Sequence, residues 1–103
     1  MEIQEAFNKI VDHAKLGVKS QDHLGMCRLR GRNGSMCFVG VLIDDSIYNV
    51  NLEMAPIDSW SKLLEIDLSF VSGMRKIHDG YQPEVWKKRL QTYATENGLQ
   101  FNW

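Results

Sequence analysis

The chain has 103 residues, of which 44% are hydrophobic and 24% charged, a composition typical of one folded domain and unlike that of disordered, collagenous or coiled-coil proteins. Its 12 Lys and Arg residues nearly balance 13 Asp and Glu residues, so the net charge of -1 provides no overall field that would attract nucleic acid or an anionic membrane. The longest apolar run, Cys37 to Ile43, is far shorter than the roughly 20 residues of a membrane helix. With two cysteines and no leader pattern, we expect a single cytoplasmic domain over residues 1–103.

The first predicted element is an amphipathic helix. Apolar residues recur at helical spacing from Ile3 to Ala14, and Gly17 follows as a stop signal. The segment after it, residues 17–23, shows no period and indicates a loop.

A β-hairpin is predicted next, centred on Asn33 and Gly34. This dipeptide stands between two short runs, residues 26–30 and 36–39, and both of its residues tolerate positive φ. The apolar run from Cys37 to Ile43 suits either a buried strand or a short buried helix. Residues 47–50 have the composition of a brief third strand.

Two or three helices are predicted in the second half of the chain. Capping residues and apolar spacing start one helix at Asp58 or Ser59 and a second at Asp67 or Ser69, the second ending at Asp79-Gly80. A third begins at Pro83 and ends at Asn97-Gly98. These elements together predict a single α+β domain: an N-terminal helix, a hairpin of two or three short strands, then helices.

Three arginines in the hairpin are the first candidate site. Arg28, Arg30 and Arg32 are two residues apart, so on a strand their side chains leave from one face. Guanidinium groups bind carboxylates and phosphates with two parallel hydrogen bonds, and the alternative is a solvated outer strand face. Trp103, at the C-terminus, either fills the core or is an exposed anchor for a partner.

Cysteines and histidines form a second set of candidates. Cys27 and Cys37 lie on opposite arms of the predicted hairpin, His23 precedes Cys27 by four residues, and a zinc site would take its fourth ligand from His13 or His78. Cys37 and His78 also suit a nucleophile and base, with Asp79 to orient the imidazole. However, neighbouring side chains on a helix diverge by about 100°. We therefore expect buried free thiols and a His78-Asp79 helix end, with no catalytic residue, metal or cofactor assigned.

Two longer motifs carry a resemblance to a known family. The first is Cys27-x-x-Arg30-x-x-x-Gly34-x-x-Cys37-x-Val39-Gly40-x-Leu42-Ile43 with Tyr48 after it, and the second is His78-Asp79-x-x-x-Pro83-Glu84-x-Trp86 followed by Asn97-Gly98-Leu99. Together they resemble a family of small uncharacterised proteins encoded by bacteriophages and bacterial genomes. The resemblance implies an intracellular setting and a phage or mobile-element origin, and it implies no chemistry.

The leading functional hypothesis is a non-catalytic interaction protein, a phage-encoded inhibitor that binds a host protein or nucleoprotein complex. Its partner contacts are expected at Arg28, Arg30 and Arg32, with Trp103 as a secondary anchor. One alternative is a small thiol- or metal-dependent hydrolase that uses Cys37 and His78 or a Cys/His metal site. The other is a weak nucleic-acid binder that uses the arginines, because about three phosphate contacts give low affinity.

Overall fold

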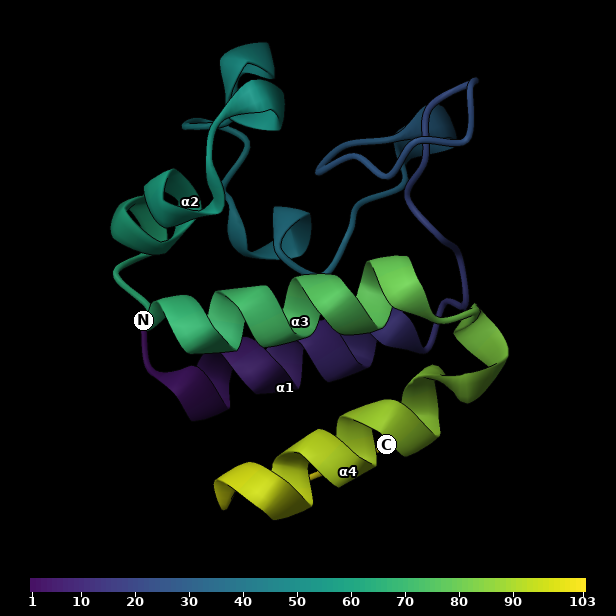
Figure 1. The fold of residues 1–103 in the computed structure, drawn as a ribbon, viewed down its shortest axis with the longest axis vertical. Coiled ribbons are helices and arrows are strands. Elements are labelled where there is room, and N and C mark those ends of the chain that lie inside the picture. The colour runs from purple at the N-terminus through teal and green to yellow at the C-terminus, as the bar shows by residue number, and fades with distance from the viewer.

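Helices make up all the regular structure of the chain in a computed structural model that describes residues 1–103 (Figure 1). None of them is both long and apolar enough to cross a lipid bilayer. The four α-helices are α1 (Ile3–Ala14), α2 (Ile57–Leu64), α3 (Leu68–Gly80) and α4 (Trp86–Asn97). Four short 3₁₀-helices join them: η1 (Arg32–Gly34), η2 (Gly40–Leu42), η3 (Val50–Met54) and η4 (Pro83–Val85).

The α-helices form where the sequence has helical apolar spacing. In α1 the buried residues recur on one face, as predicted: Ala6, Phe7, Ile10, Val11 and Ala14. Pro83 begins η4, which leads directly into α4 at Trp86. Gly98 ends α4 in the left-handed conformation at φ 66°, which glycine adopts without steric cost. Local sequence therefore determines these helices.

One apolar core joins all parts of the chain. It comprises 21 buried residues drawn from the α-helices, from the connection between α1 and α2, and from the turn between α2 and α3. At its centre the rings of Phe38 and Trp86 meet edge to face, with their centroids 4.8 Å apart. Figure 1 shows α3 between α2 and α4, with residues 17–35 reaching out at the end of the molecule where α3 finishes.

The predicted α+β class is wrong, because the chain contains no strand. Around the Asn33-Gly34 turn, where both residues do have positive φ, the two arms meet only at an isolated bridge between Arg30 and Met36. Two amides of the first arm do not bond to a neighbouring strand. The N–H groups of Leu29 and Arg30 donate to the side chain of Glu53 instead. A two-stranded hairpin is marginal by itself, and here its hydrogen-bond donors have other partners.

The rest of the predicted sheet is also absent. The segment proposed as a third strand, residues 47–50, is a turn that leads into η3. The run from Cys37 to Ile43 contains the helical turn η2. Gly40 brings this turn close to the first arm, since a Cβ atom at position 40 would lie 2.1 Å from the carbonyl oxygen of Leu29. Backbone contact thus replaces strand pairing between these segments.

Candidate functional site

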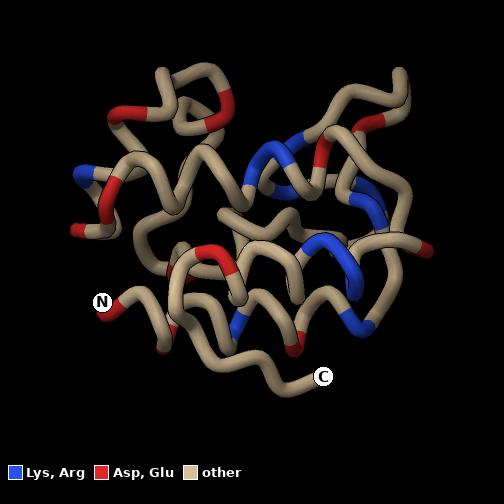
Figure 2. Tube along the Cα trace, turned by 60° about the horizontal axis from the view of Figure 1, so that its bottom comes forward, with Lys and Arg blue, Asp and Glu red and all other residues tan.

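The three predicted arginines share one shallow hollow, although they do not lie on a strand. Arg28, Arg30 and Arg32 line this hollow together with Asp22, His23 and Gly31. In Figure 2 most of the basic positions lie in the half of the molecule away from the N-terminus. The sequence therefore identified three arginines that do lie close together. The strand alternation that suggested this proximity is not its cause, because the chain has no strand here.

Two of these arginines are held by other groups of the protein. Arg28 lies 3.4 Å from an Asp22 carboxylate oxygen and 3.5 Å from an oxygen of Glu53. Arg30 is 2.6 Å from an Asp45 oxygen and donates to the carbonyl oxygen of Ile43 at 2.7 Å. The side chain of Arg32 makes no such contact and is exposed. Arg28 and Arg30 are therefore oriented by the fold, whereas Arg32 is free to bind elsewhere.

Glu53 is the central residue of this region, and the sequence analysis missed it. Its side chain is only 3% exposed, and its carboxylate accepts hydrogen bonds from the Leu29 amide at 2.8 Å, the Arg30 amide at 3.0 Å and the Tyr48 hydroxyl at 2.6 Å. Tyr48 also lies beneath the guanidinium group of Arg30, 4.6 Å from the ring centroid. One buried carboxylate from η3 thus fixes the backbone that carries two of the arginines. Nothing in the local spacing around Glu53 indicates this role.

Trp103 lies apart from the arginines. Figure 1 places the C-terminus beside α4, away from the segment that carries the hollow. The Trp103 ring is stacked with that of Phe101 at a centroid distance of 6.2 Å, and its residue is 42% exposed. The side chain neither fills the core nor stands free of the protein, and it belongs to a different face from the arginines.

A second cluster forms at the end of α3. Potential ligand atoms of Cys27, His78 and Asp79 all lie within 4.8 Å of one another. The carboxylate of Asp79 is 2.8 Å from Nδ1 of His78, so the expectation that adjacency on the helix would keep these two side chains apart is wrong. The reason is that both residues lie in the last turn of α3, where Asp79 turns back toward its neighbour.

The buried ring of His78 has a defined proton position. The backbone N–H of Ser20 donates to Nε2 at 3.1 Å, so Nε2 carries the lone pair of the neutral ring. The ring proton is therefore on Nδ1, where it is donated to Asp79. The imidazole stacks on Trp86 at 5.3 Å and meets Phe38 edge to face at 5.2 Å. His78 consequently links α3, the core and the segment after α1.

Neither thiol has the properties of an activated nucleophile. Burial and the nearby Asp79 carboxylate raise the pKa of Cys27, and burial raises the pKa of Cys37 to about 12. Burial also opposes ionisation of Asp79, but hydrogen bonds from His78 and Cys27 hold the pKa of this carboxyl below its usual value. At neutral pH both sulfurs are thus protonated beside an ionised carboxylate. Cys37 is not in the cluster with His78, so the geometry gives no support to that pair.

A small pocket of about 80 Å³ adjoins the cluster. Its wall combines both cysteines with two arginines, two carboxylates and apolar groups: Cys27, Arg28, Leu29, Cys37, Glu53, Trp60, Arg75 and Asp79. The Arg75 side chain lies 3.5 Å from Asp79. The two arginines of the wall balance its two carboxylates in charge. Such a space admits water or an ion rather than an organic substrate of ordinary size.

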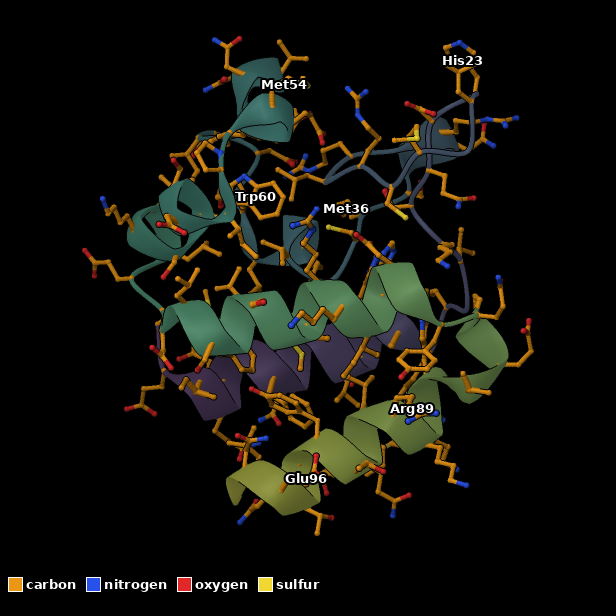
Figure 3. The ribbon with its side chains drawn as sticks, in the orientation of Figure 1. His23, Met36, Met54, Trp60, Arg89 and Glu96 are labelled. Atoms are coloured by element: carbon orange, nitrogen blue, oxygen red, sulfur yellow. The ribbon has the colours of Figure 1, made fainter.

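The remaining histidines do not approach this pocket. His23 stands at the exposed tip of its loop and points away from the molecule, as Figure 3 shows. His13 lies 2.6 Å from the carbonyl oxygen of Met36 through its Nε2 atom. Of the residues considered for a zinc site, the fold brings together only Cys27 and His78, and it adds Asp79. Asp79 was considered only as an orienting group for the imidazole.

Comparisons of the chain with protein-family models, with curated proteins and with solved structures give no match. The chain offers two candidate sites, the arginine hollow (Arg28, Arg30 and Arg32 with Asp22, His23 and Gly31) and the α3-end cluster (Cys27, His78 and Asp79).

Proposed function

We propose that this chain is a non-catalytic interaction protein whose arginine hollow binds an acidic surface of a partner protein. The observation that carries the proposal is that three guanidinium groups line one hollow while Glu53, Asp22 and Asp45 hold two of them in place. Arginines that are already oriented lose less side-chain freedom when they bind a carboxylate, which favours association.

The surroundings of the hollow suit a protein partner. Leu24 and Met26, on the same segment as Arg28, are 76% and 64% exposed. Protein interfaces combine exposed apolar side chains with arginine, and charge complementarity guides the orientation of the partner. A nucleic acid would meet only about three guanidinium groups in this hollow, and the net charge of the protein is -1, so its binding would be weak.

The family resemblance gives this proposal a setting. A phage-encoded or mobile-element protein of this kind acts in the host cytoplasm as an inhibitor of a host protein or nucleoprotein complex. Trp103 is the proposed secondary anchor, and because it lies beside α4 it would contact a separate part of the partner.

The test is affinity capture from host lysate with tagged wild type, Arg32→Ser and Lys62→Ser. Arg32 is the informative position because its side chain makes no internal contact, and Lys62→Ser removes the same charge from α2, away from both proposed contacts. We expect Lys62→Ser to retain the partner and Arg32→Ser to lose most of it, with recovery falling as salt increases. Equal recovery by the two variants would exclude the hollow as the binding site. Loss of capture after nuclease treatment would instead support direct binding to nucleic acid.

The stability of the variants separates binding effects from folding effects. Arg32→Ser should change the free energy of unfolding by no more than about 0.5 kcal/mol, because an exposed side chain without partners is replaced. Arg30→Ser removes the ion pair to Asp45 and the hydrogen bond to Ile43, so its unfolding midpoint in urea should fall measurably. A triple serine variant of Arg28, Arg30 and Arg32 is therefore unsuitable as a test of binding alone. If Arg30→Ser unfolds at the same urea concentration as Arg32→Ser, the anchoring contacts do not stabilise the protein.

A further inference from the structure

We propose that Cys27, His78 and Asp79 bind a divalent transition-metal ion, with Zn²⁺ the best match, at the end of α3. A thiolate, an imidazole and a carboxylate are the three ligand types that zinc sites use in proteins. Their candidate atoms lie within 4.8 Å of one another, close to the spacing that one tetrahedral ion requires. The proposal does not depend on the proposed function, although Arg28 lines both the pocket beside this cluster and the arginine hollow.

The fold builds this cluster from two segments. His78 and Asp79 are consecutive in the last turn of α3, and Cys27 comes from the segment after α1, which forms an isolated bridge between Gln21 and Cys27. The imidazole is completely buried, and Phe38 and Trp86 fix its ring plane. Two of the three ligands are thus on a rigid helix, and the third is tied to a short backbone bridge.

The pocket beside the cluster supplies the fourth position of the ion. Cys27 and Asp79 both line it, and its volume of about 80 Å³ is enough for an ion with water. Three protein ligands and an open position are typical of zinc sites that keep a bound water, whereas structural sites have four protein ligands. The pocket therefore provides the independent observation that the cluster has room for an ion.

Binding requires protons to move, and the structure indicates where they go. Metal binding takes the thiolate form of cysteine, so the Cys27 thiol would have to release its proton to solvent. On His78 the metal would take the Nδ1 position, so the ring proton would move to Nε2 and face the N–H of Ser20, which now donates to that atom. Two donors cannot remain opposed in this way, so the Ser20 amide has to find another acceptor.

The movement of Ser20 connects the metal to the arginine hollow. The Ser20 hydroxyl donates to the carbonyl oxygen of Arg28 at 2.7 Å, and its own carbonyl accepts from the Arg28 amide at 3.1 Å. Displacing Ser20 therefore changes the backbone position of Arg28. The proposed ion would alter the geometry of the hollow through this pair of hydrogen bonds.

The first test is titration with Co²⁺, which substitutes for Zn²⁺ and has visible absorption. We expect one equivalent to produce the intense ligand-field bands of a tetrahedral ion and a sulfur-to-cobalt charge-transfer band, both abolished by excess Zn²⁺. Cys27→Ser should lose the charge-transfer band, while His23→Gln, the control, which removes an exposed histidine outside the cluster, should retain it. No spectrum with wild type, or a charge-transfer band that survives in Cys27→Ser, would overturn the proposal. Far-UV circular dichroism verifies that each variant is folded.

The second test uses ¹⁵N NMR of the wild-type chain to determine which ring nitrogen of His78 carries the proton. On addition of Zn²⁺ we expect the ring-nitrogen shifts of His78 to show exchange of the protonated atom from Nδ1 to Nε2, and the amide resonance of Ser20 to move. The amides of residues 91–97 provide the reference, because this part of α4 lies beyond Trp86, which stacks on the His78 ring. Binding of Zn²⁺ without either change would show that His78 is not a ligand, and the three-residue site would be wrong.

Discussion

The helices α1, α3 and α4 and the segment between α1 and α2 are stabilised in different ways. In the helices, backbone groups bond within the element, and apolar faces enter a common core. Residues 15–56 contain no α-helix or strand. Many of their amides bond to backbone carbonyls in turns and between loop segments, and three amides, those of Ser20, Leu29 and Arg30, bond to the distant side chains of His78 and Glu53. Local spacing governs the first region and long-range polar contacts govern the second.

This difference implies unequal sensitivity to single polar substitutions. A helix that loses one exposed polar side chain keeps its backbone hydrogen bonds. The segment that carries the arginines has one buried carboxylate as acceptor for several donors, and a buried donor without a partner is costly. Three substitutions in this segment, given in order of decreasing expected loss of stability, test this difference.

Glu53→Ala should have the largest effect. It leaves two backbone amides and the Tyr48 hydroxyl without their shared acceptor and Arg28 without an ion-pair partner, and removing one partner of a buried charged contact costs about 3–5 kcal/mol. Urea unfolding measures the loss. Far-UV circular dichroism below the transition should still report the α-helices. If Glu53→Ala and the conservative Glu53→Gln both unfold at the same urea concentration as wild type, the hydrogen bonds to Glu53 do not stabilise this segment.

Gly40→Ala should follow. Its Cβ atom would meet the Leu29 carbonyl oxygen at 2.1 Å, so η2 has to move away from the first arm, with an overpacking cost of about 3 kcal/mol in the free energy of unfolding. Gly80→Ala is the matched control, because nothing lies within 4 Å of a Cβ atom there. Thermal melting of the two variants compares the regions directly. Equal melting temperatures would mean that η2 does not require this close contact.

Tyr48→Phe should have the smallest effect, about 1.5 kcal/mol for a lost hydrogen bond to a carboxylate. Burial and the Glu53 carboxylate raise the pKa of Tyr48 from 10.0 to about 12. Because the pKa of Tyr48 is higher in the folded state than in the unfolded state, its protonated hydroxyl stabilises the fold fully below pH 10.0. The stabilisation from the Tyr48–Glu53 hydrogen bond should therefore disappear as the pH rises from 10.0 toward 12. Urea unfolding across this range should show a steeper decline for wild type than for Tyr48→Phe. Parallel declines would contradict the assigned contact.

The α-helices were predictable because their information is local. The periodicity of residues 3–14 and the Pro83 and Gly98 signals placed the first and last helices close to their observed ends. The hairpin failed because a positive-φ turn at Asn33 and Gly34 fixes only a reversal of the chain. Whether the arms then pair as strands depends on where their amides find acceptors, and here the acceptor is Glu53, 20 residues beyond Asn33.

The two candidate sites were predictable only in part, because the contacts that complete them join segments distant in the sequence. The arginine residues were visible as a set, while the groups that orient them, Glu53 and Asp45, lie in segments without an interpretable pattern. Cys27 and His78 were recognised as candidates, but their proximity to each other and to Asp79 arises from the return of the chain onto the end of α3. Spacing along a helix also gave the wrong expectation for His78 and Asp79, since a terminal side chain can turn back to its neighbour.

The α-helices and the balance of charge follow from the amino-acid sequence, because apolar periodicity, the Pro83 and Gly98 helix-end signals and composition act over a few residues. Long-range folding, in contrast, brings Cys27 to an imidazole and a carboxylate and places a glutamate of η3 against the backbone that carries the arginines. Buried polar groups must find partners wherever the fold places them, and that choice depends on the whole chain.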